Sequence, residues 1–431
     1  MMTFEEAKAK LTGRQDFVKK DGLARVYACL EKIGNPHQRL KTIHVTGTNG
    51  KGSVCALFES SLRAAGLKTG LFISPHLVSM TERIQLNGKA IGPEAFTALF
   101  EEVFTAGPDL SFFELLTCMA FLYFVREKTD LAVIEVGIGG RWDTTNVLLK
   151  PELSVITSVD YDHKKYLGAT LAEIAAQKAG IIKQDGIAIA PILPPEAGTE
   201  ISKEAAAKNA QCHFFAPIFE IISYDWEKNS MTLRHKKNGE IINFGIIGEM
   251  QVSNATLVWE GLEILAGLGW PVNRAHAAAG FAAVRWPARF QAVRGGPSFG
   301  NALFIIDGAH NEEAARAFAS TWAVSPFAGR PGAFVVAMLQ DKERRAILET
   351  LSKLSGRFVF TRPDSSRAAD PCALADEMAA IKPDAEVEVQ EDIRAALSAA
   401  ARSGTAAVLG SFYLAGAALE ILGKQVAESG A

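Results

Sequence analysis

Residues 44–53 read HVTGTNGKGS, a glycine-rich stretch in which a lysine and a serine stand where they could bind phosphate. The glycines let backbone N–H groups converge on an anion, and the start of a following helix adds its positive end. Lys51 could reach the β- and γ-phosphates of a nucleotide, and the Ser53 hydroxyl could bind Mg²⁺. A glycine turn without a ligand is the alternative, but a lysine and a serine at a helix start favour phosphate binding. The loop is a variant, because Gly52 separates Lys51 from Ser53.

Three further polar residues lie at or just beyond the ends of predicted strands. Ser74 follows the strand 69–73, Glu135 lies in the strand 131–136, and His163 comes after the strand 154–157. Oxygen ligands with one imidazole suit Mg²⁺ beside a nucleotide. Taken singly, Glu135 could be a salt-bridged carboxylate and His163 a surface histidine. Their convergence at one edge of a sheet is what indicates a metal site.

Other candidates have ordinary explanations as well. Lys178 lies near a helix C-terminus, where a lysine usually complements the helix dipole. Residues 307–311, DGAHN, end a predicted strand and could grip ribose, phosphate or a reacting group, or simply cap the next helix. Arg289 could clamp phosphate or form an ordinary salt bridge.

These residues need a scaffold, and the chain alternates apolar strands with helices. That alternation predicts an α/β fold with a doubly wound parallel sheet. Residues 212–248 predict antiparallel hairpins, and residues 251–268 and 273–284 predict two helices. The segment 294–297 is the expected linker, and the strand–helix alternation restarts after it. We therefore expect two domains, residues 1–294 and 298–431.

Composition narrows the class of protein further. A net charge of −3 gives no sign of a nucleic-acid or membrane partner. Five scattered cysteines indicate reduced thiols and a cytoplasmic location. Met1–Lys20 lacks an apolar core, so we expect no secretory signal, and the apolar run 115–125 is too short to span a membrane. We also expect a monomer.

A set of motifs, in order along the chain, resembles the folylpolyglutamate synthase family, whose members are often also dihydrofolate synthases. The resemblance runs from about Asp21 to Tyr413. The motifs that carry it are HVTGTNGKGS, SPHL with TERI, EVGIGGRWDTTN, DHKKYLG, QKAGIIK, WPARF and DGAHN. This family belongs to the Mur-ligase-like ATP-dependent amide ligases.

The resemblance implies a P-loop NTPase-type domain, containing the small antiparallel section, followed by a smaller Rossmann-like α/β domain, with the active site between them. It implies a ligase of folate and one-carbon metabolism whose small-molecule partners are ATP, L-glutamate and a folate or pteroate. ATP would phosphorylate the folate carboxylate, and the glutamate amine would then displace phosphate, with Mg²⁺ neutralising the anions.

The family's site residues carry over by position. Nucleotide binding falls on Asn49, Gly50, Lys51, Gly52, Ser53, Asn254, Arg289 and Asp307. The metal ligands are Ser53, Ser74, Glu135 and His163. The pterin side falls on Phe113, Glu114, Trp142, Asp143 and Thr144, and Ser411 and His310 match the glutamate end. Catalytic roles fall on Lys51, Glu135, His163, Lys178, Arg289 and His310, with Lys178 matching the family's carbamylated lysine.

Two departures and several alternatives accompany this assignment. Ala288 stands where the family usually has glycine, and Glu312 where proline is frequent. The nearest rival function is a Mur-type ligase acting on a UDP-muramoyl peptide. A P-loop GTPase switch would need an N-K-x-D stretch, which the sequence lacks. A catalytically dead binding protein is disfavoured because the candidate catalytic residues are intact. The sequence leaves open whether dihydropteroate is a substrate and how many glutamates are added.

Overall fold

A computed structural model describes residues 2–14, 22–330 and 332–429, without the side chains of 424–429. Asp21 and part of Met1–Lys20 therefore lie outside the described residues. The chain divides into two compact units, and each is described by itself. Among the described residues, no helix is long and apolar enough to cross a membrane.

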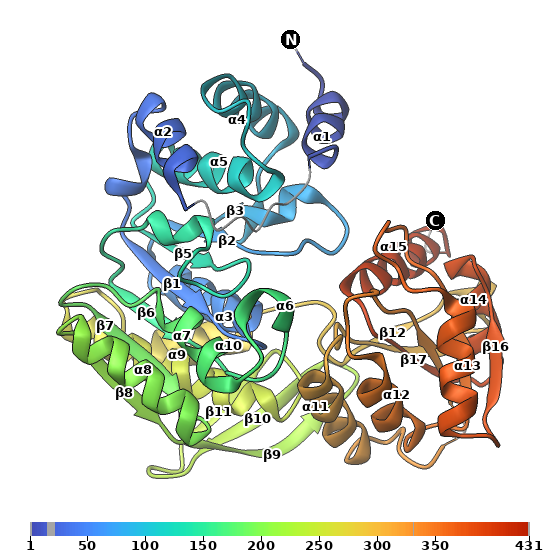
Figure 1. Cartoon of the computed structure of the whole chain (residues 1–431). Coiled ribbons are helices and arrows are strands. Elements are labelled where there is room, and N and C mark those ends of the chain that lie inside the picture. The colour runs from blue at the N-terminus through green and yellow to red at the C-terminus, as the bar shows by residue number, and fades with distance from the viewer. Residues whose placement is uncertain (1, 15–21, 331, 430–431) are drawn as a thin grey trace. The chain divides into compact units, whose positions relative to one another are not determined.

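The first unit is built on an eight-stranded sheet (Figure 1). The strand order is β4 (Lys89–Ala90), β3 (Ile84–Leu86), β2 (Thr69–Phe72), β5 (Leu131–Glu135), β1 (Thr42–Thr46), β6 (Leu153–Ile156), β7 (Ile187–Pro191) and β8 (Gln211–Phe215). Pairing is parallel from β2 to β8, and β3 and β4 pair antiparallel. The predicted doubly wound sheet is confirmed. Because β5, β1 and β6 are neighbours, their carboxyl ends meet at the same edge.

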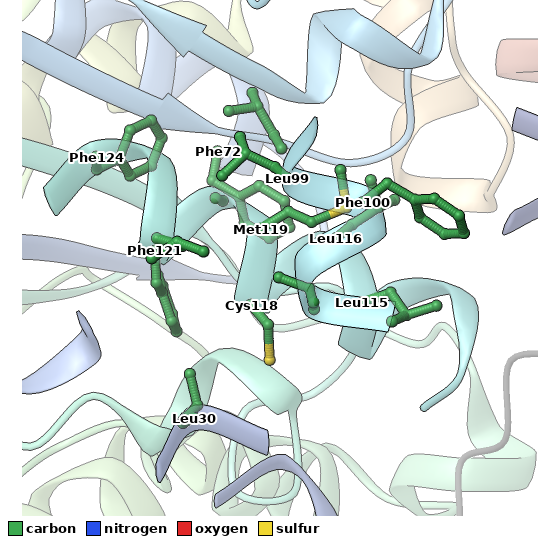
Figure 2. Packing of buried hydrophobic residues seen from close by; sticks show 14 of the residues in the cluster. Leu30, Phe72, Leu99, Phe100, Leu115, Leu116, Cys118, Met119, Phe121 and Phe124 are labelled. Carbon is green, nitrogen blue, oxygen red and sulfur yellow. The ribbon is translucent and has the colours of Figure 1, made fainter. Parts of the chain in front are cut away.

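The helices of this unit pack on the sheet or on one another. They are α1 (Phe4–Thr12), α2 (Ala24–Lys32), α3 (Lys51–Ala64), α4 (Pro93–Ala106), α5 (Phe112–Arg126), α6 (Lys164–Leu167), α7 (Leu171–Ala179), α8 (Pro195–Ala207), α9 (Met250–Gly267) and α10 (Arg274–Ala283). Figure 2 shows the core between α4, α5 and β2, where Phe72, Phe100 and Phe121 are fully buried. Each such side chain stabilises the fold by about 1.5–3 kcal/mol.

The second unit contains a six-stranded sheet (Figure 1). Its order is β12 (Gln291–Arg294), β13 (Leu303–Ile306), β17 (Thr405–Leu409), β14 (Ala333–Val336), β15 (Arg357–Phe360) and β16 (Glu386–Val389). All pairs are parallel except β12 with β13. The helices are α11 (Glu312–Ala323), α12 (Arg344–Ser352), α13 (Pro371–Ile381), α14 (Ile393–Ala401) and α15 (Phe412–Ser429). The predicted second α/β fold is confirmed.

The predicted antiparallel section is a three-stranded sheet of β9 (Phe219–Asp225), β10 (Ser230–His235) and β11 (Ile241–Phe244). It begins later than expected, because Cys212 lies in β8 and pairs in parallel with β7.

The segment 294–297, which we expected to be a linker, begins and ends in regular structure. Arg294 ends β12, which pairs with β13, and Pro297 begins a short 3₁₀ helix, so residues 294–297 are part of the second unit. Contacts divide the chain between Val284 and Arg285, and they group residues 221–234 and 243–251 with the second unit.

Candidate active site

The loop between β1 and α3 has a shape that only glycine allows at two positions. A Cβ atom on Gly47 would lie 1.9 Å from Thr157 Oγ1. Gly50 has a φ of +84°, and a Cβ there would lie 2.6 Å from Asn254 Oδ1. The buried Asn254 side chain on α9 therefore lies against the loop. α3 begins directly after Gly50, and the N-terminus of a helix can bind an anion.

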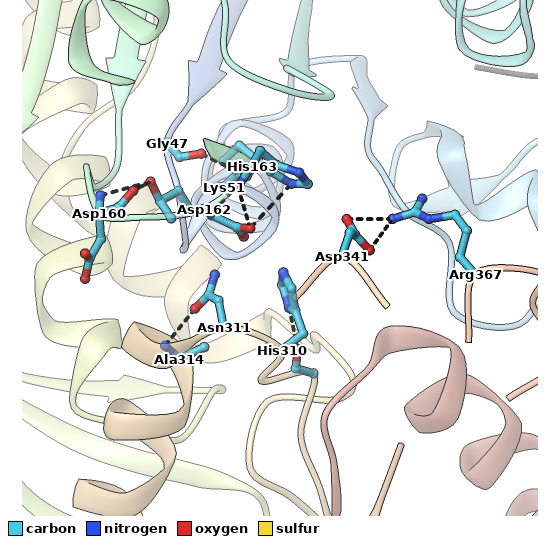
Figure 3. Close-up of polar contacts among 12 residues, drawn as sticks. Gly47, Lys51, Asp160, Asp162, His163, His310, Asn311, Ala314, Asp341 and Arg367 are labelled. Carbon is cyan, nitrogen blue, oxygen red and sulfur yellow. Dashed lines mark hydrogen bonds and ion pairs between the residues drawn. The ribbon is translucent and has the colours of Figure 1, made fainter. Parts of the chain in front are cut away.

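The end of β6 fixes this loop. Thr157 Oγ1 donates to Asn49 O over 2.5 Å, and Asn49 N donates to Ser158 Oγ over 2.9 Å. The Lys51 ammonium donates to Gly47 O at 2.9 Å and Thr48 O at 3.0 Å (Figure 3). Both acceptors lie within the loop, so the charge of Lys51 is held at the loop itself.

Ser53 gives an independent sign of a ligand. Its side chain is fully buried, and its Oγ has no hydrogen-bond partner among the described residues. A buried hydroxyl without a partner costs about 1–3 kcal/mol. A metal ion or a phosphate oxygen beside it would satisfy this atom, so Ser53 fits the expected Mg²⁺ and phosphate roles.

Glu135 ends β5 at the same edge of the sheet. It is 3% exposed, and its Oε2 accepts the backbone N–H of Ser74 at 2.9 Å. The charges of Glu135 and Lys51 both act on Cys55, whose pKa is raised by burial and by Glu135 and lowered by Lys51. The structure therefore brings Ser74, Glu135 and the phosphate loop together.

His163 lies beyond the end of β6. It has a φ of +51° at the start of α6, and its Nε2 is 3.9 Å from Asp162 Oδ1 (Figure 3). Among the described residues, no group of three or more His, Cys, Asp or Glu side chains is arranged to hold a metal. The candidate set of two hydroxyls, one carboxylate and one imidazole suits a hard cation that keeps several waters, as Mg²⁺ does.

Lys178 is 2% exposed on α7. The loop after β5 packs directly on this helix: Arg141 N donates to Gln177 O at 2.7 Å, and a Cβ on Gly140 would lie 2.9 Å from Lys178 O. The same loop thus follows Glu135 and contacts the backbone of Lys178.

The residues expected on the pterin side differ in how far they are exposed and in what they contact. Trp142 is 56% exposed, while Thr144 is buried. Phe113 packs against Phe72 with ring centroids 5.7 Å apart. Glu114 accepts the N–H of Ser111 at 2.8 Å and pairs with Arg25 at 2.9 Å, so it caps α5.

Asp143 is buried, and backbone and side-chain donors of its own loop surround it. Its oxygens accept from Ile138 N at 3.0 Å, Thr145 N at 3.0 Å and Thr145 Oγ1 at 2.5 Å. Burial raises the pKa of Asp143, and these hydrogen bonds oppose the rise.

In the second unit, two backbone N–H groups hold the Asp307 carboxylate just beyond the end of β13. It accepts from Phe290 N at 2.7 Å and Ala309 N at 2.8 Å. Burial raises its pKa and the Arg289 charge lowers it. The Arg289 guanidinium lies 4.9 Å from the centre of the Phe412 ring.

His310 and Ser411 lie at the same edge of the second sheet. His310 Nδ1 lies 2.8 Å from Gly308 O, a carbonyl that can only accept, so Nδ1 carries the proton (Figure 3). Ser411 Oγ accepts from Tyr413 N at the start of α15. The helix-cap alternative holds for Asn311, whose Oδ1 accepts from Ala314 N at 2.9 Å, rather than for Asp307.

No motif in the sequence singles out Asp341 and Arg367. They form an ion pair of 3.2 Å beyond the ends of β14 and β15 (Figure 3). Two backbone hydrogen bonds join their loops, Gln340 N to Arg367 O at 2.9 Å and Ala369 N to Met338 O at 2.8 Å. The pairing is non-local, so no local motif could have revealed it.

A phosphate-loop sheet followed by a second α/β sheet is the architecture of an ATP-dependent ligase of the Mur type, and comparison with known families agrees. The Mur ligase middle domain matches residues 45–260, and the Mur ligase glutamate ligase domain matches residues 288–411. The dihydrofolate synthase/folylpolyglutamate synthase of Bacillus subtilis (strain 168) is 33% identical over 383 residues, which is 85% of this chain and 86% of that protein.

Solved structures give the same result. Mycobacterium tuberculosis folylpolyglutamate synthase complexed with ADP has a TM-score of 0.86 at 32% identity, covering 97% of this chain and 98% of that one. An FPGS–AMPPCP–folate complex has a TM-score of 0.81 at 28% identity, covering 98% of this chain and 100% of that one. The chain belongs to the folylpolyglutamate synthase family of Mur-type ligases.

Proposed function

We propose that this protein is an ATP-dependent ligase that adds L-glutamate to tetrahydrofolate, and to dihydropteroate as a second acceptor. The observation that carries the proposal is the phosphate loop, which holds Lys51 and the unpartnered Ser53 hydroxyl in a chain whose relatives are folate ligases. The charges of Lys51 and Glu135 both act on Cys55, which follows the loop on α3. A Mur-type ligase with a UDP-muramoyl acceptor is less well supported, because the compared relatives act on folates by name.

The reaction needs an activated carboxyl group, because a carboxylate is a poor acyl donor. A carboxylate oxygen of the folate attacks the γ-phosphorus of ATP, and ADP leaves. The glutamate amine then attacks the acyl carbon of the mixed anhydride, the C–O bond to phosphate breaks, and the amine gives up a proton. The products are the amide, ADP and phosphate. Lys51 and the loop amides would stabilise the transferring phosphoryl charge.

Mg²⁺, when bound, would neutralise the charge of the phosphates and the carboxylate. Its ligands would be Ser53, Ser74, Glu135 and His163, with Lys178 in support. We propose that Lys178 is carbamylated, because a buried ammonium near these ligands would repel a cation, whereas a carbamate would attract it. Addition of CO₂ to the neutral amine forms the N–C bond and releases one proton.

The second unit would supply the remaining contacts. Arg289 and Asp307 would bind the nucleotide, and His310 and Ser411 would lie at the glutamate end. The Asp341–Arg367 pair offers a carboxylate for an ammonium group and a guanidinium for a carboxylate, which are the two ends of an amino acid. We also propose a monomeric cytoplasmic enzyme with no nucleic-acid or membrane partner, in keeping with five free cysteines and a net charge of −3.

The test is ADP release in the presence of L-glutamate and one acceptor at a time, with product masses read out. Tetrahydrofolate, dihydropteroate and a UDP-muramoyl peptide are compared. Mass gain by one glutamyl residue on either pteridine supports the proposal. Turnover with the muramoyl acceptor alone would replace it with the rival function.

Lys178 has its own test. The Lys178→Ala variant should lose ligation and regain part of it with added short-chain carboxylates. Labelled bicarbonate should give a carbamate carbon signal in the wild-type protein and none in the variant. Full activity of the variant without any additive would show that a carbamate is not needed.

A further inference from the structure

His44 is a fully buried histidine in the middle of β1, the strand that leads into the phosphate loop. Burial is the main cause that lowers its pKa, to about 3, with a smaller effect of the Lys183 charge, so the ring is neutral near pH 7. Its Nε2 lies 2.8 Å from Thr145 Oγ1, and its Nδ1 has no hydrogen-bond partner among the described residues. One ring nitrogen therefore has a hydrogen-bond partner among the described residues, and the other has none.

The direction of the hydrogen bonds follows from proton counting. The Thr145 hydroxyl has one proton, and it donates that proton to Asp143 Oδ1 at 2.5 Å. The hydroxyl can then only accept from His44, so Nε2 carries the ring proton and Nδ1 is bare. Asp143 at the end of this chain also accepts the N–H groups of Ile138 and Thr145.

This chain of hydrogen bonds connects two parts of the candidate site. Asp143 closes the loop 137–145, which follows Glu135 and packs on α7 beside Lys178. A second contact from the same strand, Thr46 Oγ1 to Gly139 O, fixes the middle of the loop. The strand that carries the phosphate loop thus also sets the position of the loop that carries the expected substrate residues.

We infer that His44 is a positioning residue, which acts through Thr145 and Asp143 to hold the 137–145 loop in the arrangement that binds the folate or pteroate. This inference rests on the proposed function. His44 is fully buried in β1, and in the proposal it contacts neither substrate nor nucleotide. Its loss should therefore affect acceptor binding and not ATP binding.

Two isosteric amides separate this role from simple core packing. In His44→Gln, the amide nitrogen is as many bonds from Cβ as the histidine Nε2, so it can still donate to Thr145. In His44→Asn, the amide nitrogen takes the place of Nδ1 and cannot reach Thr145. We expect His44→Asn to raise the KM for the acceptor roughly tenfold or more, with the Kd for ATP unchanged, because Thr145 loses its donor. His44→Gln should stay within about threefold of wild type.

Thr145 offers the matching pair. Thr145→Ser keeps the hydroxyl and should behave as wild type, while Thr145→Val should resemble His44→Asn. The double variant His44→Asn, Thr145→Val should raise the acceptor KM little more than either single variant, because both substitutions break the same series of hydrogen bonds. His37→Asn is the control, since His37 is also buried but has no hydrogen-bond partner at either ring nitrogen among the described residues. It should lower the unfolding midpoint without a selective change in KM.

Nitrogen NMR of histidine-labelled protein reads the ring directly and needs no turnover. We expect one histidine, absent from the His44→Gln spectrum, with a protonated Nε2 and a bare Nδ1 that stays neutral down to about pH 5. A protonated Nδ1 would overturn the inference, as would equal KM values for the Gln and Asn variants or an equal loss of ATP binding. If the wild-type enzyme failed to ligate any pteridine, the proposed function would be wrong. The NMR measurement of the His44 ring proton would still test the hydrogen-bond arrangement, because it does not depend on turnover.

Discussion

The Lys51 ammonium donates to two carbonyl groups of its own loop, so it is already held at the proposed phosphate site. We expect Lys51→Ala to lower the rate of ligation by about 10³-fold or more, because a transition-state charge contact is lost. Steady-state ADP release with saturating substrates measures this. Lys68→Ala is the control, since Lys68 forms an exposed ion pair with Glu127 in the same unit. A folded Lys51→Ala enzyme with near-normal turnover would refute the phosphate-loop assignment.

Ala288 gives a prediction about stability. Its φ is +55°, a left-handed conformation that costs a residue with a Cβ about 1–2 kcal/mol and costs glycine almost nothing. A glycine at this position, as the family resemblance leads us to expect, would therefore have a reason in the backbone conformation. Ala288→Gly should leave the free energy of unfolding unchanged or raise it by up to about 1 kcal/mol, measured by urea denaturation.

The comparison for Ala288 is Ala315→Gly. Ala315 is fully buried in α11 with ordinary helical geometry, so glycine there should cost about 1 kcal/mol or more. Equal destabilisation by both substitutions would contradict the account of Ala288.

At the scale of elements, the contact between the loop after β5 and α7 depends on small residues. A Cβ on Gly140 would lie 2.9 Å from two carbonyl oxygens of α7, those of Gln177 and Lys178. Gly140→Ala should push the loop from the helix and destabilise the first unit by about 1–3 kcal/mol, with a loss of ligation. The readouts are the thermal midpoint and the rate of ADP release.

Gly198 is the matched glycine, because it lies within α8 with nothing near its missing Cβ. Gly198→Ala should stabilise the protein by up to about 1 kcal/mol through helix propensity and leave ligation unchanged. The Gly140 account fails if both alanines act alike.

The sequence predicted the elements whose signal is local. Leu131–Glu135 and Leu153–Ile156 are continuous apolar runs, as expected for parallel strands covered on both faces. The sequence analysis assigned β8 to the antiparallel section and the end of β12 to a linker. Both are partly exposed strands at the edge of a sheet, and their pairing partners cannot be read from the local sequence. The candidate site divides in the same way. Lys51, Ser53 and Glu135 lie in recognisable motifs, while the His44–Thr145–Asp143 chain and the Asp341–Arg367 pair arise only on folding.

At the scale of the whole molecule, buried neutral histidines predict a dependence of stability on pH. An unfolded histidine binds a proton near pH 6.5. Burial lowers the pKa of His44 to about 3 and that of His76 to about 4, so between these values and 6.5 the unfolded state binds more protons. Acidification through that range should therefore destabilise the fold, with His44 contributing up to ~1.4 kcal/mol per pH unit.

Urea midpoints at a series of pH values from 7.5 to about 4.5 measure the effect. Other groups contribute too, so the informative quantity is the difference between wild type and His44→Gln. The wild type should lose stability more steeply below pH 6.5, and parallel curves would contradict the prediction.

The boundary between the units gives a prediction about fragments. Within the second unit, Trp226 packs on Phe290 and Phe327 at 5.7 and 6.1 Å, although it lies far earlier in the chain. A fragment of residues 285–431 lacks Trp226, and a fragment of 298–431 also lacks β12 and Phe290. We expect the shorter fragment to aggregate and the longer one to fold with a lower midpoint than the second unit of the full chain.

Circular dichroism and light scattering of both fragments test this expectation. Equal solubility and equal midpoints would show that β12 and its aromatic partners add little, and would favour the boundary expected near residues 294–297.

The central position of β1 has a consequence for the order in which the protein is made. The phosphate loop is shaped by Thr157 and Ser158, and its Gly50 lies against Asn254. None of these three residues has been synthesised when the loop itself has just left the ribosome. A growing chain therefore lacks the finished loop until about residue 254 has left the exit tunnel. Under the proposed function, ATP in the cell cannot stabilise shorter nascent chains. Strands β1 to β5 must instead stay soluble by their own packing until β6 and α9 arrive.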